Sequence, residues 1–265
     1  MPFFERDHIQ FHYIDTGEGK PFIFLHGLGG DMQQTAEVFE AQAGIRFISM
    51  ECRGHGETRP VGRAEGYSFD SFGDDVVALM DHLKVETAAL GGISMGAGVS
   101  LNVAIRYPER VSKLILSRPA WLDEPLPENL RVMQEIASYI QRFGAQEGIG
   151  LFRQTEHYLK IQHEAPDVGQ SLLRQFTQPR AAETVIKLER MPADVPYRDP
   201  KALGRIAVPT LVLGNDIDPL HPAGMAETLA QAIPGARLEW LTSKSLDKAR
   251  HIREAKSLIG AFLRA

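Results

Sequence analysis

The stretch that decides the fold covers residues 91–99 and reads Gly-Gly-Ile-Ser-Met-Gly-Ala-Gly-Val. Residues 92–96 match Gly-x-Ser-x-Gly, a sharp turn that holds a serine between a buried strand and a helix. The flanks support this turn, because residues 87–90 are strand-like and residues 99–106 have apolar side chains at helical spacing. A nucleophile in a strained backbone needs small residues two positions away, and both are glycines. Ser94 is therefore the candidate nucleophile, and an ordinary glycine-rich turn is the alternative interpretation.

Two apolar segments upstream are predicted to be strands. Residues 21–25 form a short continuous apolar run, as expected for a strand covered on both faces of a parallel sheet, and residues 46–50 look like the next strand. The first run ends in His26-Gly27-Leu28-Gly29-Gly30-Asp31. Glycines at the carboxyl end of a strand let backbone N–H groups approach a ligand, so this is a candidate oxyanion loop; a mere turn is the alternative. After the second run, Arg53 is expected to tie neighbouring loops together by charge-assisted hydrogen bonds.

The remaining segments continue an alternation of strands and helices. Strand-like runs occupy residues 9–15, 111–116, 209–213 and 237–241, and helices are predicted at residues 67–83, 223–232 and 252–263, with Asp70 near the first N-cap. Such alternation indicates βαβ units and a parallel sheet. The predicted fold class is α/β, with a mostly parallel central sheet of about eight strands flanked by helices.

The interval between residues 118 and 206 has no strand signal. It contains recurrent prolines and helical segments such as residues 130–143 and 171–176. We predict that residues 118–206 form a helical cap inserted after the sixth strand. Residues 1–117 and 207–265 would then form the core domain.

Composition narrows the class of partner. The chain has 265 residues, 43% of them hydrophobic, a net charge of -5 and no run of five basic residues, which argues against nucleic acid as a partner. Its one cysteine, Cys52, excludes an internal disulfide and fits a reducing compartment. The amino terminus becomes acidic too early for a signal peptide, and no segment reaches 18 consecutive apolar residues. We expect a cytoplasmic monomer or homodimer with a small-molecule substrate and no membrane partner.

A serine hydroxyl needs a histidine base, and that base needs an acid to orient it. The chain order for this type of turn is serine, acid, histidine, which removes the five histidines that precede Ser94. His157 and His163 lie in the predicted cap. His221 opens a helix close to the acid candidates, where a packing or capping role is expected. His251 remains as the predicted base, in a loop between the last strand and the closing helix.

The acid is expected after the strand at residues 209–213. Asp218 is favoured because it directly precedes a proline and a helix, while Asp216 and Asp123 are alternatives. The predicted oxyanion hole consists of two backbone N–H groups, from Leu28 in the glycine loop and from Met95 at the start of the helix after Ser94. The amino terminus of that helix adds its dipole.

Together these motifs resemble the α/β-hydrolase fold superfamily. The resemblance rests on residues 26–30, Arg-Gly-His-Gly at 53–56, the serine turn, Tyr-Pro-Glu-Arg-Val at 107–111, Asp-Pro-Leu-His-Pro at 218–222 and His251, and it spans almost the whole chain except the cap. It implies a triad of Ser94, Asp218 and His251, a cap after the sixth strand, and no cofactor. This chain departs from the pattern in a longer acid loop after Gly214 and in His251, which follows an arginine and a basic loop at 244–250 rather than a glycine.

The resemblance also orders the expected functions. The epoxide hydrolases and haloalkane dehalogenases of this superfamily use an aspartate nucleophile, so a serine in the turn argues against these two functions. The favoured function is a serine hydrolase that cleaves a small carboxylic ester, lactone or thioester through an acyl-enzyme on Ser94. A carbon–carbon bond hydrolase or perhydrolase of the same superfamily, and a non-catalytic ligand-binding member, are the alternatives.

Two groups of residues bear on the substrate. Trp121, Phe143 and Tyr158 in the predicted cap are candidate substrate-binding residues; the alternative is that they pack the cap onto the sheet. Lys248 and Arg250 offer attraction to an anionic substrate, with a solvated charged face as the alternative.

Overall fold

Eight strands form one mixed sheet in residues 2–265, the part of the chain that this computed structural model describes. Its spatial order is β1-β2-β4-β3-β5-β6-β7-β8, with β1 and β2 antiparallel to their neighbours and β3 to β8 parallel. The predicted α/β class is thereby confirmed. The strands are β1 (Phe3–Arg6), β2 (Ile9–Thr16), β3 (Lys20–Leu25), β4 (Ile45–Met50), β5 (Ala88–Ile93), β6 (Val111–Ser117), β7 (Thr210–Gly214) and β8 (Arg237–Trp240).

Helices cover both faces of the sheet, which explains the continuous apolar run of β3. Phe22 and Phe24 belong to a buried cluster with residues of α1 (Met32–Val38) and α9 (Lys244–Arg264). Ile23 and Leu25 point the other way, into a cluster with residues of α2 (Phe69–His82), α3 (Met95–Arg106) and α8 (Ala223–Ala232). Successive side chains of a strand alternate between faces, so a strand buried on both sides has no polar positions.

The start of α2 places its N-cap close to Asp70, as expected, and identifies the capping residue. Ser68, rather than Asp70, is the N-cap: its Oγ accepts a hydrogen bond from the backbone N–H of Ser71 at 3.1 Å. A serine at this position satisfies one of the helix's free N–H groups. Asp70 lies in the first turn, where its negative charge interacts favourably with the helix dipole.

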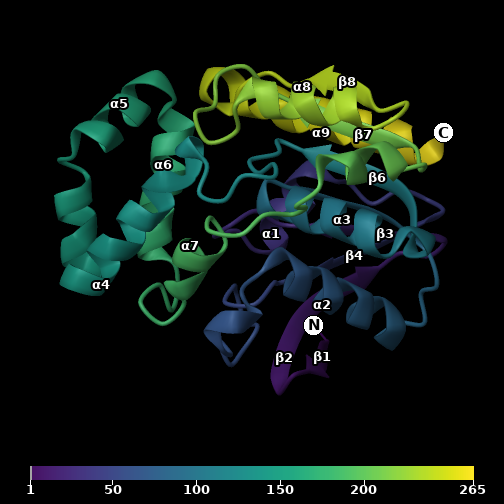
Figure 1. The fold of residues 1–265 in the computed structure, drawn as a ribbon, viewed down its shortest axis with the longest axis horizontal. Coiled ribbons are helices and arrows are strands. Elements are labelled where there is room, and N and C mark those ends of the chain that lie inside the picture. The colour runs from purple at the N-terminus through teal and green to yellow at the C-terminus, as the bar shows by residue number, and fades with distance from the viewer. Residues whose placement is uncertain (1) are drawn as a thin grey trace.

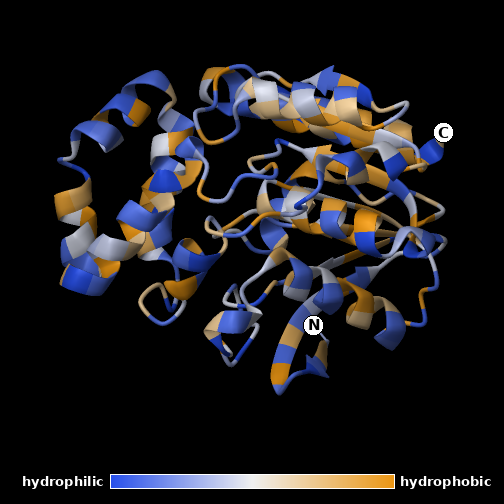
Figure 2. Cartoon of the chain, in the orientation of Figure 1, coloured by the Kyte–Doolittle hydropathy of each residue, from blue (hydrophilic) through white to orange (hydrophobic). Residues whose placement is uncertain are grey.

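The segment between β6 and β7 is helical. It contains α4 (Arg131–Phe152), α5 (Glu156–Glu164), α6 (Pro166–Thr177) and α7 (Ile186–Arg190), which gather on one side of the sheet (Figure 1). Each of α4 to α6 carries hydrophobic and hydrophilic residues, typical of helices with one buried face (Figure 2). Gly144, with φ of 74°, interrupts α4 directly after residues 130–143, where a helix was predicted. No helix within residues 2–265 is long and apolar enough to cross a membrane.

The strand order reverses beside β3. β4 lies on one side of β3 and β5 on the other, with Leu25 at the end of β3 paired to Gly92 near the end of β5. In open α/β sheets such a reversal opens a crevice at the carboxyl ends of the strands, where ligands bind. The loop after β3 is the glycine loop and the turn after β5 holds Ser94, so the topology brings them together.

A buried ion cluster ties the loop after β4 to α2. The guanidinium of Arg53 binds both carboxylate oxygens of Asp75 at 2.7 Å, and its Nη2 also reaches Asp7 at 2.8 Å. Arg6 in β1 donates a further hydrogen bond to Asp75 at 2.7 Å. Arg53 and Asp75 are both buried, and the predicted structural role of Arg53 is confirmed.

Replacing Asp75 with alanine is expected to lower the free energy of unfolding by about 3–5 kcal/mol, because it leaves the Arg53 guanidinium buried without its main partner. Urea denaturation at neutral pH measures the change. Asp81→Ala is the control, since it removes a carboxylate that pairs with Arg110 at the exposed surface, where a change within about 1 kcal/mol is expected. Equal losses in the two variants would contradict a special role for the buried cluster.

Candidate active site

Ser94 occupies a strained turn between β5 and α3. Its backbone angles are φ 56° and ψ −110°, and its N–H donates to the carbonyl of Ser117 in β6 at 2.9 Å. A Cβ on Gly92 would lie 2.3 Å from the carbonyl carbon of Gly96, and a Cβ on Gly96 would lie 2.4 Å from the carbonyl oxygen of Leu25. Both glycines are therefore required by close contacts. The turn projects Ser94 from the switch point at the amino terminus of α3.

The glycine loop leaves one N–H group without an acceptor. Gly27 donates to Oε1 of Gln34 at 2.7 Å, and Gly29 donates to Nε2 of His55 at 3.0 Å. The N–H of the loop's last glycine closes a turn at 2.8 Å. Leu28 is the exception, since its N–H has no acceptor among residues 2–265. Met95 offers a second donor, because the first N–H groups of a helix have no intrahelical acceptor.

Two histidines in contact with one another hold this loop in place. The rings of His26 and His55 lie 4.6 Å apart, and His26 links the Cys52 N–H (3.0 Å) to the Gly27 carbonyl (2.8 Å). Burial lowers the pKa of His26 to about 4 and the pKa of His55 well below its usual value. Both rings are therefore neutral at pH 7, and each keeps the unprotonated nitrogen that accepts a backbone N–H.

Asp218 lies at the carboxyl end of β7 and pairs with a histidine. Its Oδ2 is 2.8 Å from Nδ1 of His221, and its Oδ1 accepts the N–H of Leu220 at 3.1 Å. Burial alone would raise the pKa of Asp218, but the charge and hydrogen bond of His221 and the charge of Arg118 hold it well below its usual range. Asp216 is exposed, so the buried carboxylate of this loop is Asp218.

His251 lies in a helix rather than in the predicted loop. α9 begins at Lys244, eight residues before the predicted start, and a break at Asp247 (φ −152°) separates its first turn from the rest. Asp247 restarts the helix by accepting the N–H of Arg250 at 2.9 Å, which leaves His251 in the first turn after the break. The buried ring of His251 contacts the carbonyl of Thr242 through Nδ1 at 2.8 Å.

A small cavity of about 50 Å³ brings several of these groups together. Ser94, Asp218 and His221 all line it, as does Leu28, whereas His251 is absent from its walls in the described part of the chain. The cavity shares walls with a groove of about 350 Å³ that leads outward between α6 and the start of α9. Its other walls are formed by Gly27, Gln34, Ile93, Arg118, Trp121, Leu130, Met133, Asp167, Val168, Ser171, Arg174, Leu220 and Lys244.

Sequence comparison decides the family. Residues 20–245 match the model of the alpha/beta hydrolase fold. The chain belongs to the α/β-hydrolase fold family. An AB hydrolase superfamily protein of Bacillus subtilis is 30% identical over 247 residues, 88% of this chain and 87% of that protein. The non-heme chloroperoxidase CPO-A1 of Kitasatospora aureofaciens is 28% identical over 242 residues, with 88% and 87% covered. The crystal structure of the enol-lactonase from Burkholderia xenovorans LB400 superposes with a TM-score of 0.78 at 24% identity, covering 100% of both chains.

The aromatic residues predicted to bind substrate in this α/β hydrolase occupy two places. Trp121 lines the Ser94 cavity, and its Nε1 donates to the carbonyl of Met191 at 3.1 Å. Tyr158 is buried against Phe152, with ring centroids 5.3 Å apart, and Phe143 is half-buried in the same group of helices between β6 and β7. Neither Phe143 nor Tyr158 lines the cavity within residues 2–265, because both lie on helices whose apolar faces pack against other helices of this segment.

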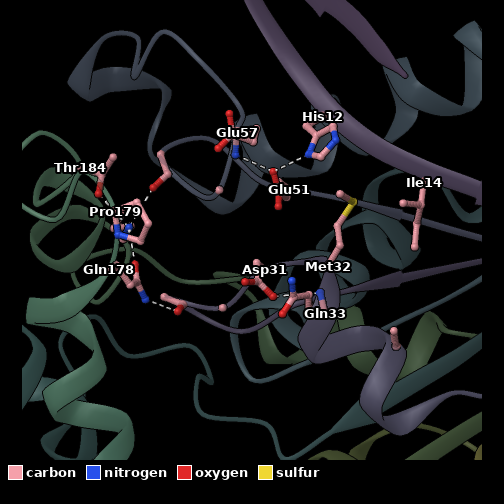
Figure 3. Close-up of a pocket in the computed structure, with 16 residues that line it drawn as sticks. His12, Ile14, Asp31, Met32, Gln33, Glu51, Glu57, Gln178, Pro179 and Thr184 are labelled. Carbon is pink, nitrogen blue, oxygen red and sulfur yellow. Dashed lines mark hydrogen bonds and ion pairs between the residues drawn. The ribbon is translucent and has the colours of Figure 1, made fainter. Parts of the chain in front are cut away.

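The same α/β hydrolase has a larger pocket, of about 420 Å³, beside the glycine loop (Figure 3). Gly29 and Gly30 line it, whereas Gly27 and Leu28 line the Ser94 cavity. In this pocket Glu51 accepts hydrogen bonds from the N–H of Glu57 at 2.7 Å and pairs with Nδ1 of His12 at 2.9 Å.

Residues between β6 and β7 form the opposite wall of that pocket. Lys187 donates to the carbonyl of Gly54 at 2.8 Å, and Gln178 donates to the carbonyl of Gly29. From α6, Gln175 donates to the carbonyl of Leu28 at 3.3 Å. These hydrogen bonds fasten the helical segment between β6 and β7 to the loop that carries the free N–H of Leu28.

Sequence reasoning missed most of the cavity wall, including three side chains that are cationic or can become so. Arg118 directly follows β6, Lys244 opens α9, and His221 was assigned a packing role. For His221 a local signal exists, because a histidine three positions after Asp218 in a turn can reach the carboxylate. Arg118 and Lys244 approach Ser94 only through the fold, and no motif marks them.

Proposed function

We propose that this α/β hydrolase cleaves a small carboxylic ester, lactone or thioester through an acyl-enzyme on Ser94. The observation that carries the proposal is one cavity in which a strained serine lies with a buried Asp218–His221 pair and the free N–H of Leu28. A nucleophile, an oriented base and a donor for the oxyanion are the three components that acyl transfer needs.

In the proposed reaction, Ser94 Oγ attacks the acyl carbonyl while a histidine takes its proton. The N–H groups of Leu28 and Met95 stabilise the oxyanion, and the histidine then gives the proton to the departing alcohol or thiol. Water repeats the sequence on the acyl-enzyme and releases the acid. Asp218 orients the histidine ring and stabilises its charged form.

Two histidines compete for the role of base. Chain order predicts His251, and that prediction stands beside a second candidate that the contacts favour. His221 hydrogen-bonds Asp218 and lines the Ser94 cavity, while His251 hydrogen-bonds a backbone carbonyl. We therefore propose His221 as the base, since a general base must lie within reach of the proton it takes.

The experiment that tests the proposed function combines covalent labelling with turnover. We expect a fluorophosphonate probe to label Ser94 of the wild-type protein, with the site read by peptide mass spectrometry. We also expect turnover of at least one member of a panel of short esters, lactones and thioesters. A protein that is neither labelled nor active on the panel would be a ligand-binding member of the family, and the proposal would fail.

The chloroperoxidase relative gives a specific reason to test one alternative. A perhydrolase would transfer the acyl group from Ser94 to hydrogen peroxide instead of water, so peracid formation from acetate and peroxide detects it. A panel of dienoate ring-cleavage products tests carbon–carbon bond hydrolysis in the same way. If the protein turns over either of these substrates faster than the best ester, it is a perhydrolase or a carbon–carbon bond hydrolase rather than an esterase.

A further inference from the structure

Arg118 is an arginine held at the wall of the Ser94 cavity with most of its donors free. It directly follows β6, in a left-handed conformation (φ 48°) fixed by a hydrogen bond from its N–H to the carbonyl of Leu213 at 2.7 Å. Its side chain is 8% exposed, and Nη1 lies 3.3 Å from Oδ2 of Asp218. Nε is buried with no acceptor among residues 2–265. A guanidinium has five N–H donors, and burying one without a partner costs free energy.

Lys244 approaches the same cavity from the start of α9. It is half-buried, lines both the cavity and the outer groove, and forms no hydrogen bond or ion pair through its side chain within the described residues. Burial, and then the charge of Arg118, lower the pKa of Lys244 to about 8. Two cationic side chains at one small cavity favour an anion between them.

The carboxylates nearby leave part of both cations without a partner. Asp218 accepts from Nη1 of Arg118 at 3.3 Å, but it is also engaged by His221 and by the N–H of Leu220, at 2.8 and 3.1 Å. Asp167 lines the cavity too, but its side chain forms no ion pair with Lys244 within the described residues. Nε of Arg118 and the ammonium of Lys244 are therefore left to bind a ligand at the cavity wall.

We propose that the Ser94 cavity accepts an acyl group that ends in a carboxylate, which Arg118 and Lys244 bind. This inference rests on the proposed function and specifies its substrate class: half-esters or half-thioesters of short dicarboxylic acids. A guanidinium matches the planar geometry of a carboxylate. The cavity volume of about 50 Å³ corresponds to roughly four water-sized positions, so the acyl chain is short and the leaving group lies in the outer groove.

The first experiment compares two esters of similar length in a pH-stat, monoethyl succinate and ethyl pentanoate. The wild-type protein is expected to have a kcat/KM at least about tenfold higher for the charged ester, because a hydrogen bond to a charged group contributes more than a neutral one. Lys244→Gln is expected to reduce the ratio of the two kcat/KM values about tenfold, and Lys244→Arg to restore most of it. Lys160→Gln, which removes a lysine charge from the exposed surface of the cap, should leave the ratio unchanged.

A binding experiment separates this inference from the proposed function. Succinate is titrated calorimetrically into the Ser94→Ala protein and into the same protein carrying Lys244→Gln or Lys160→Gln. We expect binding that only Lys244→Gln weakens. Succinate binding of this kind without turnover of any ester would support the anion site and overturn the hydrolase function. Ester turnover with no preference for the charged ester and no succinate binding would overturn the anion site alone.

Discussion

Ser94→Ala is expected to reduce kcat on the best ester of the panel by on the order of 10⁴-fold or more. The substitution removes the oxygen that forms the acyl-enzyme, while the Leu28 and Met95 N–H groups and the binding cavity remain to support a residual rate. Alanine fits the turn sterically, because it has no atom beyond Cβ. The measurement is steady-state hydrolysis, with fluorophosphonate labelling lost in parallel.

Ser100→Ala is the matched control for this prediction. Ser100 is a buried serine in the same helix, α3, and its Oγ donates to the carbonyl of Gly96 at 2.9 Å. It does not line the Ser94 cavity within residues 2–265, so we expect kcat to stay within about threefold, since losing one hydrogen bond chiefly affects stability. Full activity in Ser94→Ala would contradict the acyl-enzyme, whatever the control shows.

The sequence predicted the sheet well because its parallel strands are buried on both faces. Runs such as residues 21–25 in β3 and 114–116 in β6 are continuously apolar for that reason. β1, with only four residues and an exposed first position, has too little pattern to detect, and α1 is a short helix within the loop region after β3. The predicted start of α9 lies too far along the chain, because the break at Asp247 separates its first turn from the rest of the helix.

The candidate site was predictable where its chemistry lies in one motif. Ser94 and Leu28 belong to glycine-marked loops at strand ends, and the topology brings them together. Chain order identifies the histidine less firmly than the glycine motifs identify Ser94 and Leu28, since it assumes that the last histidine lies in a loop. In the structure a capped helix contains His251, while His221 reaches Asp218 across a turn of three residues. Arg118 could not be predicted, because its role depends on a left-handed residue after β6 and on contacts far along the chain.

The choice between the two histidines leads to the second large effect. We expect His221→Gln to lower kcat/KM by about 10³-fold, because general acid–base catalysis typically contributes 10²–10⁴-fold. His251→Gln is the matched comparison, and we expect a loss within about tenfold, since its ring hydrogen-bonds a backbone carbonyl outside the cavity. Thermal melts of both proteins establish that each is folded at the assay temperature.

The pH dependence of kcat/KM distinguishes a catalytic histidine from a structural one, because replacing a structural histidine would not change the shape of the profile. Burial lowers the pKa of His221, an effect that Asp218 opposes and that Arg118 and Lys244 reinforce. A base with a lowered pKa stays neutral to lower pH, so wild-type kcat/KM should fall only below the ordinary histidine value of about 6.5. In His221→Gln this acidic limb should disappear from the residual activity, and in His251→Gln it should remain. The reverse pattern would identify His251 as the base, and it would require α9 to shift so that His251 enters the cavity beside Ser94.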